Sequence, residues 1–576
     1  GVSQRALAAE ADEKVERALM EVDYFGPVAL TKAVLPTMRA RRAGHIVVVS
    51  SVMGYVGTPG RSTYAAAKHA LHGYFDSLRA ELWREGIRVT IVCPGYVNTA
   101  VSANAVGPRG ESRGRSAATQ TRGIPAQKCA NALVRGVARG REEIVVGGWE
   151  TAGIAMKRLA PWLLSRIVRR MKFSGATARD AKRSPLHERL AARGAYFKDV
   201  SGWEGADWYA PPGVAPQVAQ LSWGRQNWFP YWRAEHAACR TGVILMDMSF
   251  MAKFAVQGRD AGRVLERLSA NRVDGVPGRI TYTQWLNERG TLEADLTVSK
   301  LGDERFMVVA SDTAHRHAFT RLARHCADAQ AFATDVTAAF AQINVQGPRS
   351  RELLQSITSA DLSNAAFPFR TAREIDIGLA RVLAVRITYL GELGYELYVS
   401  AEQAVHVYER IVAAGEQVGL VHAGLKSLAS LRMEKGYRDY GHDIDNTDSV
   451  LEAGLGFAVD VDKPGGFIGR DAVLAKKAAG PLTRRLAQVL LLDPEPLMFH
   501  AEIVYRDDRA VGYVRAASYG HTLGGAVGLA MIEAGVPLDQ KWIDAGRWEV
   551  DVAGTRYPAR VSLRPLYDPD MQRIRN

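Results

Sequence analysis

The stretch Thr281-Tyr-Thr-Gln-Trp-Leu-Asn-Glu-Arg-Gly290-Thr-Leu-Glu-Ala-Asp295-Leu-Thr-Val298 decides how most of this 576-residue chain folds. It predicts a strand, a turn at Gly290 and a second strand that carries Asp295 near its start. A carboxylate at that place can act as a general base or orient an amine. An aspartate beside a turn is more often a turn cap, so the stretch by itself favours the structural interpretation.

Two further stretches extend this pattern. Thr388-Tyr389-Leu-Gly-Glu392-Leu-Gly394-Tyr-Glu396-Leu-Tyr398 alternates in character around a glycine turn and predicts a hairpin. Ser430-Leu-Arg432-Met-Glu434-Lys-Gly-Tyr-Arg-Asp-Tyr-Gly441-His442-Asp443-Ile-Asp445 begins with helical periodicity. His442 has no second, suitably spaced histidine, so we expect no metal site. Residues 481–576 have short strand patterns typical of a small barrel.

Together these stretches resemble the aminomethyltransferase (glycine-cleavage T-protein) superfamily over roughly residues 184–576, in particular the C-terminal half of dimethylglycine and sarcosine dehydrogenases. The resemblance implies an aromatic-rich connector over 184–232, an α+β folate-binding fold over 233–480 and a C-terminal β-barrel over 481–576. Tetrahydrofolate is the implied cofactor. Asp295 matches the family's catalytic aspartate, and the implied folate contacts are Tyr282, Tyr389, Glu396 and Arg432.

The resemblance implies a one-carbon transferase that moves an aminomethyl or methylene unit from a small N-methyl glycine-type donor and forms 5,10-methylenetetrahydrofolate. In the flavin-linked relatives an oxidase domain makes the iminium. No Gly-x-Gly-x-x-Gly fingerprint followed by an acidic residue is present here, so we expect no FAD in this chain and consider a separate flavoprotein as a partner. The alternatives are an O- or S-demethylating methyltransferase to tetrahydrofolate and a non-catalytic folate-binding accessory protein.

The first 150 residues have a different pattern. Helical periodicity alternates with apolar runs, which predicts a parallel α/β sheet of Rossmann-like type. The run His45-Ile-Val-Val-Val-Ser50 is typical of a strand covered on both faces. Helices are expected over 11–39, 64–83 and 125–138, and strands over 45–50, 88–92 and 143–146.

Tyr64 and Lys68 are four residues apart and share one helix face, where an ammonium group can stabilise a phenolate. Val48-Val-Ser-Ser51, Tyr64-Ala-Ala-Ala-Lys68 and Cys93-Pro-Gly95-Tyr-Val-Asn98-Thr99 follow in an order that resembles the short-chain dehydrogenase/reductase family. The resemblance implies that Ser51, Tyr64 and Lys68 are catalytic. It also implies NAD(P) contacts at Lys68, Pro94, Gly95 and Thr99.

This segment departs from that family in two ways. Asp23 stands where the family has an asparagine that supports a proton relay, and no glycine-rich phosphate turn is present. We therefore expect a domain without its nucleotide half and a missing N-terminus before Gly1. NAD(P) binding and carbonyl reductase activity are expected only if that half is restored.

Charge and composition set further bounds. Residues 1–183 hold 29 Lys and Arg against 14 Asp and Glu, whereas residues 184–576 hold 45 against 47, which indicates that two unlike modules are joined. No nucleic-acid-binding motif accompanies the basic part. Residues 151–173 carry six cations among apolar residues, and we favour a packed amphipathic helix over 151–183 above a membrane-surface helix. Four scattered cysteines favour a cytoplasmic protein without disulfides.

Overall fold

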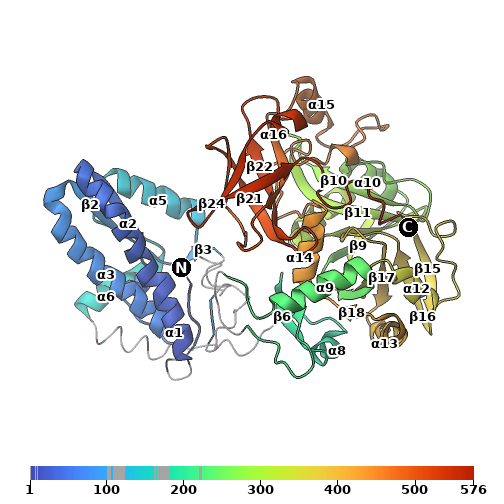
Figure 1. Cartoon of the computed structure of the whole chain (residues 1–576), viewed down its shortest axis with the longest axis horizontal. Helices are drawn as coiled ribbons and strands as arrows, with labels where there is room; N and C mark the ends of the chain where they lie inside the picture. The colour runs from blue at the N-terminus through green and yellow to red at the C-terminus, as the bar shows by residue number, and fades with distance from the viewer. Residues whose placement is uncertain are drawn as a thin grey trace. The chain divides into compact units, whose positions relative to one another are not determined.

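The computed structural model describes residues 2–6, 8, 11–99, 105–107, 123–160, 162, 164, 168, 181–218 and 224–575. The chain divides into two compact units, Gly1–Ala181 and Lys182–Asn576. Figure 1 labels their helices and strands. Each unit has its own hydrophobic clusters, and each is described by itself.

The first unit contains a three-stranded parallel sheet in the order β1-β2-β5. Helices α2 and α3 pack on this sheet through Val28, Leu71 and Phe75. The expected helix over 11–39 is broken into α1 and α2 by a π-helical turn, η1. The described elements are α1 Glu13–Met20, η1 Glu21–Phe25, α2 Gly26–Arg41, β1 Gly44–Val49, η2 Val52–Gly54, α3 Ser62–Leu82, η3 Trp83–Glu85, β2 Ile87–Pro94, β3 Val97–Asn98, β4 Ile124–Pro125, α5 Ala126–Ala138, β5 Glu143–Val146, η5 Trp149–Thr151 and α6 Ala152–Leu159.

One prediction for this sheet is wrong. Strand β1 is an edge strand, and Val47 and Val49 expose 36% and 51% of their surfaces. The apolar run has only one covered face: Ile46 and Val48 belong to the core formed with α2 and α3, whereas Val47 and Val49 point to the opposite face. Of the amphipathic helix expected over 151–183, the structure describes α6; most of residues 161–180 lie outside the described part. No helix among the described residues is long and apolar enough to span a bilayer.

The second unit contains two mixed α/β layers and a barrel. The five-stranded sheet has the order β10-β11-β12-β9-β13, and the six-stranded sheet has the order β15-β16-β17-β14-β8-β18. The layers comprise α8 His187–Ala191, β6 Ala195–Val200, β7 Trp203–Tyr209, α9 Phe229–Thr241, β8 Ile244–Asp247, β9 Ala252–Gln257, α10 Ala261–Leu268, β10 Ile280–Leu286, β11 Leu292–Gly302, β12 Arg305–Ala310, α11 His315–Cys326, β13 Phe332–Asp335, β14 Phe340–Gln346, α12 Ser350–Gln355, β15 Ala372–Ile377, β16 Ala380–Val385, β17 Gly394–Ser400, α13 Ala404–Gly415, η6 Glu416–Val418, β18 Val421–His422, α14 Leu425–Glu434, η7 Gly456–Ala458 and α15 Arg470–Ala478.

The chain after α15 confirms the expected barrel. Six antiparallel strands close in the order β19-β22-β21-β20-β23-β24. Its elements are β19 Arg484–Leu491, β20 Ile503–Arg506, β21 Arg509–Gly520, β22 Gly525–Glu533, α16 Gln540–Asp544, β23 Trp548–Val552 and β24 Thr555–Ser562. The connector expected over 184–232 contains α8 and the β6–β7 hairpin, and Trp208 is fully buried there.

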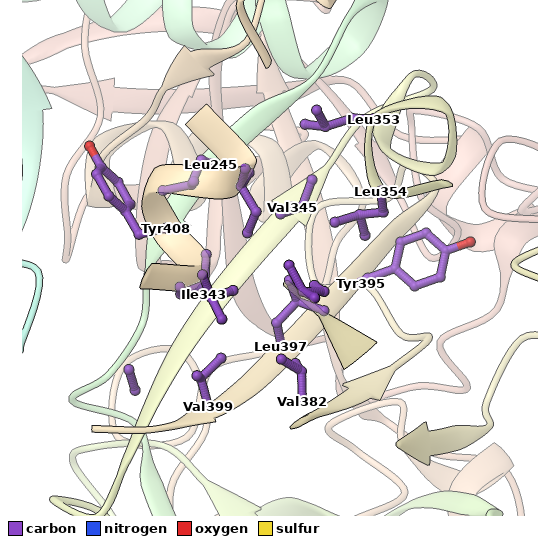
Figure 2. Packing of buried hydrophobic residues seen from close by; sticks show 14 of the residues in the cluster. Leu245, Ile343, Val345, Leu353, Leu354, Val382, Tyr395, Leu397, Val399 and Tyr408 are labelled. Carbon is purple, nitrogen blue, oxygen red and sulfur yellow. The ribbon is translucent and has the colours of Figure 1, made fainter. Parts of the chain in front are cut away.

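Each sheet of the second unit has one face covered by helices. In the six-stranded sheet, Ile343 on β14 and Leu397 on β17 pack against Leu354 of α12 and Tyr408 of α13 (Figure 2). In the five-stranded sheet, alternate residues of β11 and β12 pack against α10 and α11. Because side chains alternate across a strand, the remaining residues of these strands point to the opposite, helix-free faces.

The helix-free faces of the two sheets meet each other. Met307 and Val309 from β12 share a small hydrophobic cluster with Val385 from β16 and Tyr398 from β17. This cluster fills only part of the space between the sheets, because other inward positions on these strands hold polar side chains that are also buried. The layer between the sheets is therefore partly polar, which is unusual for a core and typical of a binding site.

Candidate functional site

Asp295 lies on the helix-free face of the five-stranded sheet. Its neighbours Ala294 and Leu296 pack toward the helices, and strand alternation turns Asp295 the other way. It is directly opposite Gln284 on β10, whose Nε2 donates to Asp295 Oδ1 at 3.0 Å. The Tyr282 hydroxyl donates to Asp295 Oδ2 at 3.0 Å. Both partners of the carboxylate are thus neutral donors.

This environment places the Asp295 carboxyl near its titration point at physiological pH. Burial raises the pKa of Asp295 to about 7, although the hydrogen bonds from Gln284 and Tyr282 lower it. A carboxyl group with a pKa close to the working pH can both accept and release a proton. The arrangement therefore suits a general base, and a turn cap would need neither the burial nor the two donors.

Glu396 lies on the helix-free face of the six-stranded sheet. Leu397 and Val399 of the same strand belong to the helix-covered core, so Glu396 and Tyr398 point the other way. The Tyr398 hydroxyl donates to Glu396 Oε2 at 2.6 Å. Burial raises the pKa of Glu396 to about 7, while Tyr398 and the more distant Lys253 lower it.

The strand next to Glu396 adds a row of buried amides. Gln342, Asn344 and Gln346 of β14 are all 5% exposed or less, and Asn344 is in register with Glu396. Gln342 Oε1 and Gln346 Oε1 have no hydrogen-bond partner in the described part of the chain, and neither has Gln284 Oε1 on the facing sheet. Buried acceptors left open in this way are costly unless a donor fills them. We interpret them as ligand-facing atoms.

A pair of stacked aromatic rings lies near Asp295. Tyr389 stacks on Tyr437 with ring centroids 6.1 Å apart, and its hydroxyl donates to the Arg438 carbonyl oxygen at 2.6 Å. Tyr389 is not in the hairpin strand that the sequence predicts. The second strand of the predicted hairpin is confirmed as β17, which pairs with β16. The first is wrong, because β16 ends at Val385 and Tyr389 lies in the connection over residues 386–393. The aromatic side chain is therefore held by its stacking partner and not by a strand.

Arg432 holds the loop that carries Tyr437. It lies in the last turn of α14, and its Nη1 donates to both oxygens of Asp443, at 2.9 and 3.1 Å, and to the Tyr437 carbonyl oxygen at 2.9 Å. His442 is paired with Asp439 at 3.3 Å. In the described part of the chain no group of three or more His, Cys, Asp or Glu side chains could hold a metal ion.

The structure thus groups Asp295 with Tyr282. Tyr389 is also near, because the charge of Asp295 raises the pKa of Tyr389, although burial raises that pKa more. Glu396 belongs to the facing sheet and joins this group only through the cluster that Ile280 and Tyr398 share. Sequence reasoning missed Gln284, Tyr398 and Tyr437. Gln284 follows Tyr282 by two residues and Tyr398 follows Glu396 by two, so period-two alternation was a usable signal for both.

The first unit holds the second candidate site. The Ser51 hydroxyl accepts from Met53 N at 3.1 Å and donates to the Pro94 carbonyl oxygen at 3.4 Å. Lys68 Nζ lies 5.5 Å from the centre of the Tyr64 ring. It donates to Asp23 Oδ1 at 2.9 Å, and Asp23 and Lys68 are only 1% and 6% exposed. The lysine charge is thus neutralised inside the protein.

The Glu150 side chain occupies the backbone segment at Pro94 and Gly95, which the resemblance assigns to nicotinamide contacts. The Glu150 carboxylate accepts from the Tyr96 backbone N–H at 2.7 Å, and a Cβ built on Gly95 would lie 2.0 Å from Glu150 Oε1. Thr99 Oγ1 donates to the Val97 carbonyl oxygen at 3.5 Å. Pro94 ends β2, where its carbonyl oxygen accepts from Ser51.

Three family models match this chain. The model for short chain dehydrogenases matches residues 1–109, the model for the GCVT N-terminal domain matches residues 186–463, and the model for the glycine cleavage T-protein C-terminal barrel domain matches residues 484–568. The chain is 43% identical to a 4-methylaminobutanoate oxidase (formaldehyde-forming) from Paenarthrobacter nicotinovorans over 399 residues, which is 69% of this chain and 48% of the oxidase. The chain therefore spans about half the length of that relative.

Two other similarities cover nearly whole proteins. An aminomethyltransferase from Geobacillus thermodenitrificans (strain NG80-2) is 32% identical over 387 residues, which is 67% of this chain and 98% of the relative. The crystal structure of a glycine cleavage system aminomethyltransferase T from Bartonella henselae matches with a TM-score of 0.57 and 22% identity, covering 67% of this chain and 98% of that chain. At this identity the structural match shows a shared fold.

Proposed function

The chain belongs to the glycine cleavage T-protein (aminomethyltransferase) family over residues 186–463 and 484–568, and from this premise we propose that its second unit transfers a one-carbon unit to tetrahydrofolate. The observation that carries the proposal is Asp295, a carboxyl group with a pKa of about 7 between two neutral donors and facing a partly polar layer. The first unit resembles a short-chain dehydrogenase segment, and we assign it no part in this reaction.

The residues between the sheets fit a reduced pterin. The amino and ring N–H groups of a pterin are donors, and Glu396 Oε1 and the open oxygens of Gln342 and Gln346 are acceptors. The stacked rings of Tyr389 and Tyr437 offer a flat apolar surface of the kind that a planar ring prefers. Glu396 makes no ion pair within the described part of the chain, so its charge is available to a ligand.

The protein's own part in the reaction centres on a proton. Tetrahydrofolate supplies the nitrogen atoms that take up the carbon. Asp295 removes the proton that such a nitrogen loses on forming a bond to carbon, and Tyr282 and Gln284 keep the carboxylate aimed at it. Arg432, through Tyr437 and Asp443, holds the aromatic surface in place. Holding both reactants in one layer replaces a bimolecular encounter, which is a large part of the rate advantage.

We propose an N-methylated amino acid as the source of the carbon, delivered as an iminium or as formaldehyde. The name of the 4-methylaminobutanoate oxidase, which is formaldehyde-forming, supports this donor class. The oxidation itself requires a redox partner, for which we propose a separate flavoprotein. Mass analysis of the folate product distinguishes this chemistry from methyl transfer out of an O- or S-methyl donor, because the first gives a methylene and the second a methyl folate.

The test is a comparison of the parent with Asp295→Asn, using formaldehyde and an amine, or a flavoprotein with sarcosine, as the carbon source. The variant keeps the shape of the site and removes the base. We expect folate affinity within about tenfold of the parent and turnover lower by roughly 10² to 10⁴. The uncatalysed condensation is measured separately and subtracted. A parent that does not exceed this background would instead be a folate-binding module without catalysis.

A further inference from the structure

The last described segment of the chain leaves the barrel and lies against the layers of the second unit. Strand β24 ends at Ser562, and the C-terminal end of the chain lies apart from this strand (Figure 1). Residues 566–575, which we call the strap, form this segment. Tyr567 N donates to the Glu434 carbonyl oxygen at 3.3 Å. The strap therefore runs from the barrel to the end of α14.

Glu392 is the main contact of the strap in the connection over 386–393. The side chain of Glu392 is buried, with 1% of its surface exposed. Arg573 Nε donates to both of its oxygens, at 2.9 and 2.7 Å, and the Tyr567 hydroxyl donates to Oε1 at 2.7 Å. From α9, Arg240 Nη1 donates to the same Oε1 at 3.0 Å. Two strap residues therefore hold a carboxylate that has little access to water.

Lys435 is the second contact of the strap, and it follows α14 directly. Its side chain is fully buried, and Nζ donates to the Asp568 carbonyl oxygen at 2.7 Å and to Asp568 Oδ2 at 3.0 Å. Its aliphatic stem lies against Gly391, where a Cβ would be 2.3 Å from Lys435 Cγ. Gly391 also adopts φ +81°, so both its backbone and this close approach require glycine. Lys435 therefore contacts the strap and the connection over 386–393 at once.

These two contacts lie beside the two stacked rings of the candidate site. Tyr389 comes three residues before Glu392, and Tyr437 comes two residues after Lys435. The rings of Tyr389 and Tyr437 lie 24° from parallel. Tyr567 of the strap lies between the two contacts, because its hydroxyl bonds to Glu392 and its ring centre is 5.9 Å from Lys435 Nζ. The strap therefore joins the two segments that present the stacked rings.

The strap is itself ordered by Asp568. The backbone of Asp568 adopts φ +42°, in the left-handed region that residues with a Cβ rarely adopt. Its carboxylate accepts from Gln572 N at 3.0 Å and from Arg573 N at 3.4 Å, and its carbonyl oxygen accepts from Met571 N at 3.1 Å. A conformation of this kind costs free energy and persists where the surrounding contacts maintain it. The resulting turn brings Arg573 back to Glu392.

We propose that the strap positions the flat surface of Tyr389 and Tyr437 for a pterin ring, with Arg573 and Asp568 as its positioning residues. The inference rests on the proposed function, because the pterin is the ligand proposed for these rings. Arg573 and Asp568 act through the buried groups with which they pair and not by contact with the ligand. A surface whose segments are held in place before binding loses less conformational freedom on binding, which raises its affinity.

The experiment is anaerobic calorimetry with tetrahydrofolate and with 6-methyltetrahydropterin, which presents the ring alone. Arg573→Gln removes the charge that faces Glu392, and Asp568→Asn removes the charge that faces Lys435 in a residue type that also tolerates the left-handed backbone. Each variant should bind both probes about 3- to 30-fold more weakly than the parent. Arg573→Lys keeps the charge and should recover most of the loss. Hydrogen exchange measured by mass spectrometry should become faster in residues 386–393 of Arg573→Gln and stay unchanged in β10.

A double-mutant cycle separates positioning from a general effect on the fold. Tyr389→Leu removes one of the two rings. Adding Arg573→Gln to Tyr389→Leu should cost no further pterin affinity, because the strap acts through the ring. Losses that add up in the double variant would overturn the inference. If Arg573→Gln does not fold, Asp568→Asn with Tyr437→Leu gives the same test through the other contact.

The matched control is Arg564→Gln, which removes an exposed ion pair to Asp570 at 2.8 Å just before the strap. It should leave both affinities as in the parent. An equal loss in the control would overturn the inference, because it would show a general effect of charge. If the parent binds both probes and the two strap variants bind them as tightly, only the role of the strap fails. If the parent binds neither probe, the proposed function fails as well.

Discussion

The two units treat an inward-facing charge in opposite ways. In the first unit, the Lys68 ammonium group is neutralised by Asp23 at 2.9 Å, and both side chains are almost fully buried. In the second unit, the donors to Asp295 and Glu396 among the described residues are neutral groups, and burial raises the pKa of each carboxyl to about 7. A buried charge with a partner leaves nothing for a ligand to compensate, whereas a charge without one costs free energy that a ligand or a proton can return. The carboxylates of the second unit are therefore the groups available to a ligand.

The largest expected effect is a loss of stability in the first unit. Asp23→Ala leaves Lys68 buried without its partner, which should lower the local free energy of unfolding by about 3–5 kcal/mol. Hydrogen exchange measured by mass spectrometry should show faster exchange in α3 and no change in β10 or β17. The control Asp76→Ala removes a more exposed ion pair to Arg79 and should cost about 1 kcal/mol or less. If Asp23→Ala exchanges like the parent, the pair is not structural.

The next effect concerns Glu396. Glu396→Gln keeps the size of the side chain but puts a donor where a pterin presents N–H groups. We expect a loss of about 2–3 kcal/mol, or roughly thirty- to two-hundred-fold in tetrahydrofolate affinity by calorimetry. Glu374→Gln, at an exposed position of β15, should leave the affinity unchanged. Parent-like affinity in Glu396→Gln would mean that the pterin binds elsewhere.

A smaller effect follows from the raised pKa of Asp295. The folded protein keeps a proton on this group up to about pH 7, whereas an unfolded chain releases it near pH 4. Between these values the folded state binds more protons, so the contribution of Asp295 to stability falls as the pH rises and stays low above pH 7. Asp295→Asn should therefore melt about 2–4 °C above the parent at pH 8 and close to it at pH 4.5. A melting difference that is independent of pH would contradict the assignment.

The last prediction is that nicotinamide cofactors do not bind. We predict no saturable NADH or NADPH binding to this chain by calorimetry up to millimolar concentration. The sequence has no glycine-rich phosphate turn, and the Glu150 carboxylate occupies the Tyr96 backbone N–H where a nicotinamide contact is expected. Micromolar binding would contradict this prediction, because it would show that the first unit binds a ligand of its own. Glu150→Ala is the informative variant if binding is seen.

The order of elements was readable from local patterns. The turn at Gly290, which adopts φ +74°, separates β10 from β11 as expected, and Arg432 and Glu434 lie in the helix α14, as their helical pattern predicts. These features depend on neighbours in the chain, so periodicity and glycine positions are sufficient signals. The short-range arrangement of Asp295 after a turn was equally visible. Its function was not, because a turn cap and a general base look alike in a single strand.

Long-range packing decided the rest. The run His45–Ser50 predicts a doubly covered strand, but Val47 and Val49 are exposed, because the cover of each face depends on helices that pack on the sheet from elsewhere in the chain. In the second unit the sequence alone names Asp295 and Glu396 as separate residues of separate hairpins. Only the packing of two sheets through their helix-free faces brings both half-buried carboxylates into one layer. The same packing raises the pKa of each and leaves the oxygens of Gln342 and Gln346 without a partner among the described residues. Burial and electrostatic shifts arise from contacts far apart in the sequence, and no local pattern records them.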